Sequence, residues 1–247
     1  MSFRLCTLAT VLLLTISGTT FAQQDFSKVE IKTTHVNGTV YMLEGSGGNI
    51  AVSAGEDGFL MVDDQFAPLA DKIRAAMNEV GTGDLRFLLN THHHGDHTSA
   101  NHIFGSEATI IAHDNVRKRL ADKPKAGWPI ITFASSLSIH FNGEEIKAIH
   151  FANSHTDGDA VIHFTKSNVI HLGDMFFNGM FPYVDIESGG NALELSRNIG
   201  EFIKSLPDDI KVIPGHGPLG TIDDLQNYHN MLEETIVIVS KSKESGK

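Results

Sequence analysis

One stretch of the sequence decides the fold, and it places four histidines and one carboxylate within six positions: Asn90-Thr91-His92-His93-His94-Gly95-Asp96-His97-Thr98. Imidazole nitrogens and carboxylate oxygens are the ligands that borderline cations such as zinc prefer. These side chains lie too close in sequence for one ion to use all of them. The stretch therefore predicts a metal site, and two ions are the natural expectation.

The apolar run before this stretch predicts how its side chains are spread. Residues 85–89 have the composition of a buried strand that ends at Asn90, and Asp96 begins a short helix. In the extended segment between them His92 and His94 point to one side and can share one ion, while Asp96 and His97 turn toward another. The alternative is a solvated histidine-rich loop that binds metal adventitiously. Ligands elsewhere in the chain decide between the two.

The first 22 residues have the pattern of a cleavable secretory signal. Arg4 is followed by an apolar run over residues 5–16 and by the small-residue exit Thr20-Phe21-Ala22. The apolar run is shorter than the roughly 20 residues that a spanning helix needs. We therefore expect residues 23–247 to form the mature protein, a single domain in the periplasm or outside the cell, with no membrane anchor.

Cysteine content and charge narrow the classes of protein. The one cysteine, Cys6, lies inside the predicted signal, so the mature chain has no disulfide and depends on its core and on bound metal. Without Arg4, the count of Lys and Arg falls from 19 to 18 against 30 Asp and Glu. This acidic balance disfavours nucleic acid and anionic membranes as partners. We expect the partner to be a small-molecule substrate.

Two runs of strands, each followed by helices, set the expected architecture. The first run predicts an antiparallel meander with strands at 29–34, 39–43, 49–53 and 59–62. Helices and strands then alternate: a helix over 66–80, a strand at 85–89, a short helix over 99–104, a strand at 108–112 and a helix over 114–121. From Ile130 the plan repeats with strands at 130–133, 137–141, 146–151, 160–165 and 169–172, a helix over 192–206, a strand at 211–213 and a helix over 223–240. Two sheets that face each other with helices outside are expected, an α/β fold.

Three further ligand candidates each sit just past a predicted strand: His155, Asp174 and His216. Loops at strand ends are where functional groups gather. Glycines at 158, 173, 215 and 217 would let the backbone approach a metal closely.

The pattern His92-x-His94-x-Asp96-His97, followed by His155, Asp174 and His216, resembles the complete metal set of the metallo-β-lactamase superfamily. The resemblance extends across the mature chain and implies a four-layer αββα sandwich with two Zn²⁺ ions at one edge, between the sheets. It implies that one ion takes His92, His94 and His155, that the other takes Asp96, His97 and His216, and that Asp174 bridges them. A bridging hydroxide would then attack a substrate carbonyl, with Asp96 and Asp174 as the catalytic carboxylates.

Asp174 is a departure from the true β-lactamases, which usually carry cysteine or serine there, and it resembles the glyoxalase II, lactonase and general hydrolase branches. Phe177 stands where the acyl-homoserine lactonases often have tyrosine. We therefore expect a zinc hydrolase of a β-lactam, lactone or ester. The alternatives are a glyoxalase II-like thioesterase or another lactonase, an iron-dependent sulfur dioxygenase, and a binding protein that kept the fold without the chemistry.

Residues around the cluster are expected to support it. Asp63 and Asp64 end the fourth strand, and one of them is expected to accept a hydrogen bond from a ligand or from the histidine loop, the alternative being a plain turn. Residues 45–49, which include Asn49, and the aromatic segment 176–191, which includes Asn178 and Tyr183, are the expected rims of the pocket. His93 is expected to point away from the metals.

Overall fold

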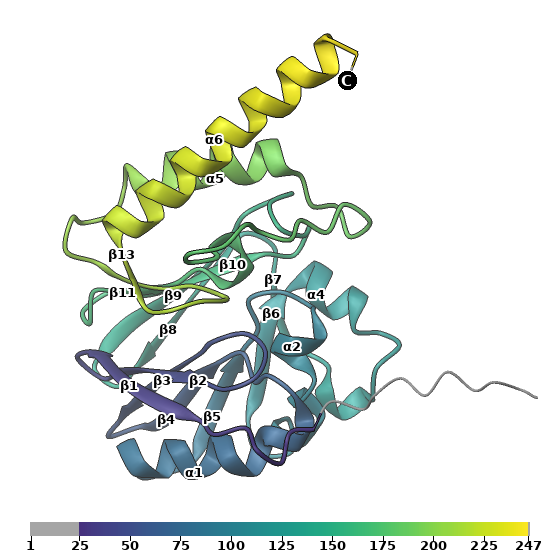
Figure 1. Cartoon of the computed structure of the whole chain (residues 1–247). Helices are drawn as coiled ribbons and strands as arrows, with labels where there is room; N and C mark the ends of the chain where they lie inside the picture. Colours follow the sequence, from purple (N-terminus) through teal and green to yellow (C-terminus); the bar gives the residue numbers. More distant parts are fainter. Residues whose placement is uncertain (1–24, 247) are drawn as a thin grey trace, which may run out of the picture.

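The computed structural model describes residues 25–246, so the predicted signal at residues 1–22 lies outside the described residues. Two mixed sheets face each other, with α1 outside the first sheet and α5 and α6 outside the second (Figure 1). This is the expected four-layer αββα sandwich. Within the described residues, no helix is both long and apolar enough to span a bilayer.

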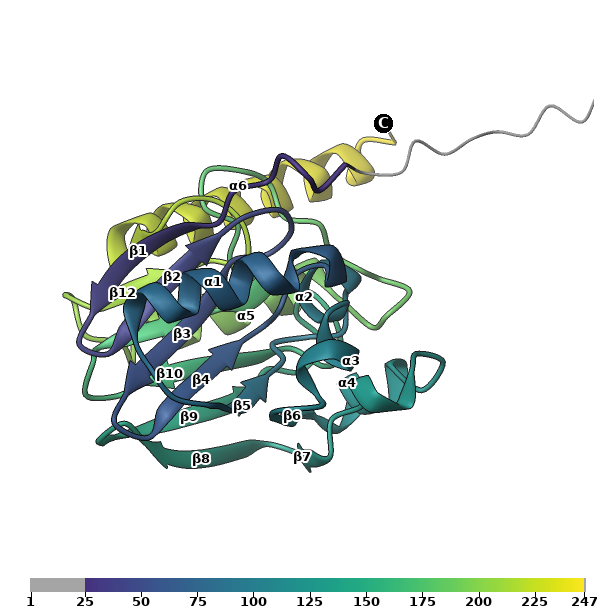
Figure 2. The ribbon, with the colours of Figure 1, turned by 90° about the horizontal axis from the view of Figure 1, so that it is seen from below.

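The first sheet has the order β1 to β7. Its strands are β1 (Lys32–Asn37), β2 (Val40–Glu44), β3 (Ile50–Gly55), β4 (Gly58–Val62), β5 (Leu85–Leu89), β6 (Thr109–His113) and β7 (Ile131–Phe133). The first four pair antiparallel as the predicted meander, and β4 to β7 run parallel. The parallel part is connected by the helices α1 (Ala70–Val80), α2 (Gly95–Thr98), α3 (Asn101–Phe104) and α4 (Asp114–Arg119). Figure 2, seen from below, shows α1 lying across the strands of this sheet.

The second sheet has the order β13-β12-β11-β10-β9-β8. Its strands are β8 (Ser136–Phe141), β9 (Glu144–His150), β10 (Ala160–Phe164), β11 (Val169–His171), β12 (Lys211–Ile213) and β13 (Gly220–Thr221). The helices α5 (Ala192–Ile203) and α6 (Ile222–Glu244) cover its outer face. The C-terminal end of α6 projects beyond the body of the molecule (Figure 1).

The expected repeat from Ile130 was placed too early. β7 belongs to the first sheet, where it pairs parallel with β6, and the second sheet begins at β8. The first strand was also set too early, at 29–34 instead of Lys32–Asn37. The sequence of a short strand does not identify the strand with which it pairs, because pairing depends on contacts distant in sequence. The other predicted ranges agree with the observed elements to within a few residues, and β13 has no predicted counterpart.

Alternating side chains build three cores. Along β4, Leu60 and Val62 face the second sheet, whereas Phe59 and Met61 pack with α1. Along β10, Ile162 faces the first sheet while Val161 packs under α5 and α6. Since successive strand side chains point to opposite faces, each apolar strand is buried on both sides, as a central layer of a sandwich requires.

Candidate metal centre

The ends of four strands bring the predicted ligands together. His92, His94, Asp96 and His97 follow β5; Asp174 follows β11 and His216 follows β12. β11 and β12 are parallel neighbours, so the loops after them leave the same edge of the sheet. His155 lies in the loop between β9 and β10. All seven predicted side chains meet at the edge where the two sheets face each other.

Three imidazoles form one half of the cluster. His94 Nδ1 lies 3.1 Å from His92 Nε2 and 2.9 Å from His155 Nε2. Asp174 Oδ2 lies 3.7 Å from His92 Nε2 and 3.5 Å from His155 Nε2. These four atoms surround one point, and the four residues form a group able to hold a metal ion.

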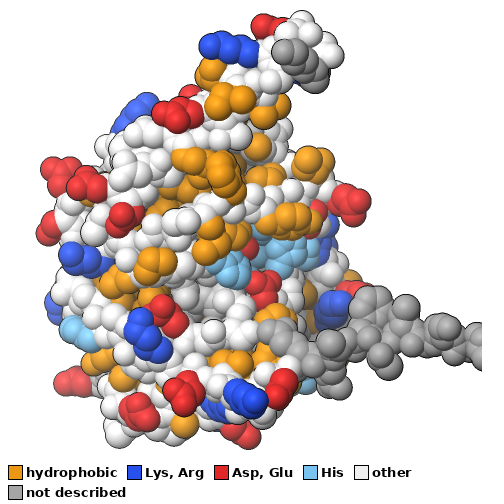
Figure 3. Space-filling view, in the orientation of Figure 1, with side chains coloured by type: hydrophobic (Ala, Val, Ile, Leu, Met, Phe, Trp, Pro, Cys, Tyr) orange, Lys and Arg blue, Asp and Glu red, His pale blue; other side chains and the backbone are white. Residues whose placement is uncertain are grey.

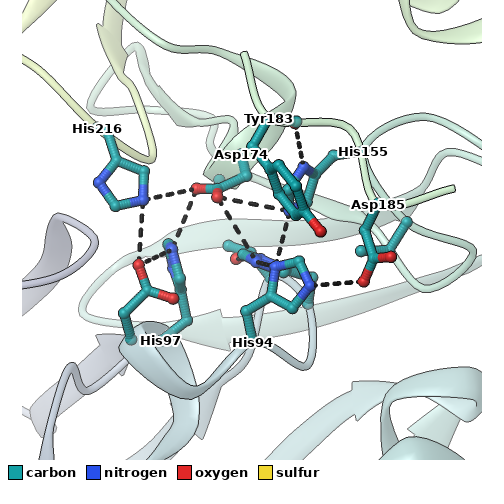
Figure 4. Close-up of polar contacts among 12 residues, drawn as sticks. His94, His97, His155, Asp174, Tyr183, Asp185 and His216 are labelled. Carbon is teal, nitrogen blue, oxygen red and sulfur yellow. Dashed lines mark hydrogen bonds and ion pairs between the residues drawn. The ribbon is translucent and has the colours of Figure 1, made fainter. Parts of the chain in front are cut away.

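The other half of the cluster uses the second oxygen of Asp174. Its Oδ1 lies 3.1 Å from His97 Nε2 and 3.4 Å from His216 Nε2. Asp96 Oδ2 lies 3.2 Å from His216 Nε2 and 3.6 Å from His97 Nε2. In Figure 4, Asp174 stands between the His94–His155 side and the His97–His216 side. The carboxylate therefore offers one oxygen to each half.

The outer nitrogens of the imidazoles determine where the protons lie. Thr91 Oγ1 donates to Asp63 Oδ2 at 2.7 Å, so it accepts from His92 Nδ1 at 3.1 Å. His155 Nδ1 donates to the carbonyl of Tyr183 at 2.8 Å. A neutral imidazole carries one proton, so the inner Nε2 atoms of both histidines present lone pairs to the cluster.

Outer hydrogen bonds also fix the protons of His94 and His97, the two other predicted histidine ligands in the loop after β5. His94 Nε2 donates to Asp185 Oδ2 at 2.9 Å, and His97 Nδ1 donates to Asp63 Oδ2 at 2.8 Å. In the neutral rings that a bound cation would require, their inner nitrogens also present lone pairs. Carboxylates and imidazoles of a metal site are commonly oriented by outer hydrogen bonds of this kind. Asp63 serves two residues, since it also accepts from the backbone N–H of Thr91 at 2.8 Å.

A cluster of lone pairs in contact fits a cation. His97 Nε2 and Asp174 Oδ1 are buried. Although they lie close together, neither atom forms a hydrogen bond within residues 25–246. Buried polar atoms without partners cost free energy, and a divalent cation would satisfy both. Nitrogen and oxygen donors together suit zinc and similar borderline ions. The residues present therefore fit two divalent ions, one in each half of the cluster.

Electrostatics favour the ligand forms of several groups. Burial holds the pKa of His92 well below its usual range and also lowers that of His155. Burial alone would raise the pKa of Asp174, but the adjacent His97 holds it well below its ordinary value. In turn, although burial opposes it, the Asp174 and Asp63 carboxylates raise the pKa of His97 well above its usual range, so a metal ion bound there would have to displace a proton. Neutral imidazoles and an ionised carboxylate are the forms that bind a metal.

Two glycines make room for this geometry. A Cβ at Gly215 would lie 2.0 Å from Asp174 Oδ1, and a Cβ at Gly48 would lie 2.1 Å from the His97 ring. Real Cβ atoms do not approach other atoms so closely, so only glycine lets these loops pass beside the ligands. Gly215 is one of the glycines that the sequence predicts beside the metal. Gly48 lies in the predicted rim, and only the folded loop shows that it packs against His97.

The residues expected to support the cluster, Asp64 and Asn49 among them, form hydrogen bonds to different loops. Asp64 accepts from the backbone N–H of Ala100 at 3.0 Å, and its own N–H donates to the carbonyl of His97. Asn49 is buried, and its side chain donates to the carbonyls of Pro214 and Gly217. Asn49 therefore holds the loop that carries His216, and it does not face the pocket.

Asn178 and Tyr183 lie in the loop between β11 and α5. The Asn178 side chain donates to the carbonyl of Pro218, and its backbone N–H donates to the carbonyl of His216. Tyr183 is 63% exposed, and its ring centroid lies 6.0 Å from those of His94 and His155. Tyr183 thus lies over the half of the cluster formed by the three imidazoles (Figure 4).

Sequence reasoning missed Asp185, which binds the outer nitrogen of His94. Its only signal was a carboxylate two positions after Tyr183 in the predicted rim. His93 does not join the two halves of the cluster; its ring packs beside His94, and its Nε2 lies 3.4 Å from Ser188 Oγ.

Comparisons with known proteins agree with this geometry. The family model of the metallo-beta-lactamase superfamily matches residues 34–216, so the chain belongs to that superfamily. Its fold, its family and its His/Asp cluster are those of a metal-dependent hydrolase.

Several relatives and solved structures are similar to the chain. The probable metallo-hydrolase YqgX of Bacillus subtilis strain 168 is 29% identical over 65% of this chain and 83% of its own length. A hydroxyacylglutathione hydrolase of a Polaromonas species is 27% identical over 60% of this chain, which spans only 55% of that relative. The metallo-beta-lactamase of Pontibacter korlensis is 14% identical with a TM-score of 0.72, covering 83% of this chain and 99% of its own. DIM-1 metallo-beta-lactamase is 18% identical with a TM-score of 0.72, covering 84% of this chain and 100% of its own. At these identities the structural likeness shows the fold alone.

Proposed function

We propose that the protein is a dinuclear zinc hydrolase, exported to the periplasm or beyond, that opens a lactone, ester or β-lactam. The observation that carries this proposal is the placement of Asp174, whose two oxygens face two separate sets of imidazoles. Residues 1–22 support export by their composition.

Each half of the cluster would hold one ion. His92, His94 and His155 would hold the first, Asp96, His97 and His216 the second, and Asp174 both. Bound there, two divalent ions would supply hydroxide at neutral pH and polarise a carbonyl oxygen. No serine or cysteine nucleophile is required.

Asp96 is the carboxylate of the cluster that a substrate can reach. Its side chain is 29% exposed, whereas that of Asp174 is 5% exposed. A carboxylate at the mouth of the site can orient the attacking water or carry a proton to the leaving group. Asp174 is buried between the imidazoles. It would serve as a ligand to both halves of the cluster and would fix their relative position.

A thioesterase of the hydroxyacylglutathione hydrolase kind is the second candidate. It is favoured by aspartate at position 174 and by the similarity to hydroxyacylglutathione hydrolases from Polaromonas and Prochlorococcus marinus. Both candidates attack a carbonyl carbon and need the same cluster, so the leaving group distinguishes them.

Two measurements test the proposal. Elemental analysis of the purified protein should give two zinc ions per chain; a single iron would favour the oxygenase alternative, and no metal would contradict both. A panel of β-lactams, lactones, esters and thioesters, assayed with and without a chelator, should show chelator-sensitive turnover in at least one class. Absence of turnover on every β-lactam would remove that substrate from the proposal.

A further inference from the structure

A groove beside the metal cluster lies between the loop after β11 and helix α6. It has a volume of about 380 Å³, within the range of roughly 300–1,000 Å³ that ligand pockets occupy. Its walls are largely apolar and include Phe177, Met180, Phe181, Tyr228 and Met231. The proposed hydrolytic chemistry does not use any of these side chains.

Phe177 connects this groove to the cluster. Its ring stacks on that of His216, with centroids 5.2 Å apart and planes 18° from parallel. Its centroid also lies 6.1 Å from that of His155. The next residue, Asn178, lines the groove and donates its N–H to the carbonyl of His216. The ring of Phe177 therefore lies between the groove and the proposed metal ligands.

The rim of the groove is apolar although it faces solvent. Met180 is 49% exposed and Phe181 is 70% exposed. In Figure 3, hydrophobic side chains gather beside the histidines on this face of the molecule. Contiguous apolar surface of this kind at the mouth of a site usually marks a binding surface.

Charge determines what the groove accepts. No lysine or arginine is among its lining residues, and its single charged residue, Asp224, accepts hydrogen bonds from Thr221 at the start of α6. A carboxylate placed here would have no cationic partner and would lose its hydration. An uncharged apolar group would lose only unfavourable contact with water.

The basic side chains lie instead in a separate hollow beside His93 and His94. Arg119 and Lys123 line that hollow, but Arg119 forms a two-pronged ion pair with Asp157 and Lys123 lies 3.4 Å from Asp122. An anionic substrate arm would be drawn to that side, in competition with these carboxylates.

We propose that the groove between residues 177–181 and α6 binds an uncharged apolar arm of the carbonyl substrate. This inference rests on the proposed function and narrows its substrate class. It favours medium-chain esters, lactones or thioesters over substrates whose arm ends in a carboxylate.

Asn227 offers a way to close the groove without disturbing the core. Its side chain is exposed on α6 and lines the groove, so Asn227→Trp would fill the space from the solvent side. Gln226→Trp places the same bulk at the neighbouring exposed position, which does not line the groove. The pair separates blockage from a general effect of tryptophan on the helix.

Turnover of 4-nitrophenyl esters by the zinc-loaded protein is the first readout. From acetyl to hexanoyl, kcat/KM should rise at least tenfold, because burial of each methylene is worth about fourfold. Asn227→Trp should reduce this rise to less than threefold, whereas Gln226→Trp should keep it. The adipate monoester, which ends in a carboxylate, should react at least tenfold more slowly than the hexanoyl ester. A rise that persists in Asn227→Trp, or equal rates for the two six-carbon esters, would overturn the inference.

Binding of 1-hexanol, measured by titration calorimetry on the same three zinc-loaded proteins, tests the groove without hydrolysis. Binding should be saturable in the wild type and in Gln226→Trp, and lost in Asn227→Trp. Equal binding in all three, or none in the wild type, would contradict the groove. If hexanol binds as expected but no ester is hydrolysed, the proposed function fails while the apolar site stands.

Discussion

Asp185 Oδ2 lies 2.9 Å from His94 Nε2, and this contact fixes which nitrogen of His94 faces the cluster. The proton on Nε2 leaves Nδ1 with the lone pair that lies among the inner nitrogens of His92 and His155. Asp185 is itself held in place by the N–H of Ser188, which donates to its Oδ1 at 3.0 Å. A residue of the loop between β11 and α5 therefore orients a proposed metal ligand.

Replacing Asp185 with asparagine should weaken zinc binding. The amide keeps the shape of the side chain but removes the charge that favours the Nε2–H form of His94, and the loss of such an outer partner typically costs about 10–100-fold in metal affinity. Competition with a chromophoric chelator would measure the change. Glu187→Gln removes the same charge from an exposed position of the same loop and should leave zinc affinity within about twofold of the wild type. Equal affinities for the two variants would show that Asp185 does not act through His94.

Asp96→Asn separates a role in proton transfer from a role in metal binding. If the Asp96 carboxylate carries a proton, the variant assayed at saturating zinc should keep two ions and lose about 10²–10⁴-fold in kcat, the usual contribution of a general acid or base. Zinc content and kcat must be measured on the same sample. Retention of both ions with nearly normal turnover would sink the proton-transfer role.

The ligand pattern was accessible from the sequence because it is local. His92, His94, Asp96 and His97 occupy one loop, and the spacing alone sets which side chains share a side. His155, Asp174 and His216 each follow an apolar strand, and their assignment to the cluster came from the family resemblance. The structure brings all seven together at one edge.

Contacts between distant loops could not be read from the sequence in the same way. Asn49 holds the carbonyls of Pro214 and Gly217, more than 160 positions away, and Asp185 reaches His94 across 91 positions. Such contacts depend on how irregular loops fold back, for which periodicity has no signal. The placement of β7 in the first sheet was missed for the same reason, since three residues of strand character fit either sheet.

Tyr228→Phe should stabilise the protein. The Tyr228 hydroxyl is buried and has no hydrogen-bond partner among the residues that the structure describes, while its ring packs edge-on against Phe176 with centroids 5.2 Å apart. An unsatisfied buried hydroxyl costs about 1–3 kcal/mol, so removing it while keeping the ring should raise the free energy of unfolding by about 1 kcal/mol. Urea denaturation would measure this, with Tyr183→Phe, an exposed hydroxyl, as the control. A loss of stability would mean that the Tyr228 hydroxyl is hydrogen-bonded to water.

His113, whose ring stacks on that of His150, should make stability depend on pH. Their rings stack with centroids 3.6 Å apart and planes 9° from parallel. Burial and the neighbouring His150 lower the pKa of His113 below its ordinary value. Because the unfolded chain then binds a proton more readily than the folded one, the contribution of His113 is complete above a pH of about 6.5 and is lost as the pH falls toward its folded pKa.

His113→Asn tests this dependence. His113 Nδ1 accepts from the N–H of Asn115 at the start of α4, and asparagine can accept the same bond as a favourable first residue of a helix. Urea denaturation of chelator-treated protein at a pH of about 7.5 and about 5.5 removes the contribution of metal release. Between these two pH values His113→Asn should lose less stability than the wild type, whereas His140→Asn, at an exposed position of β8, should lose as much as the wild type. An unchanged pH dependence in His113→Asn would show that protonation of His113 is not coupled to folding.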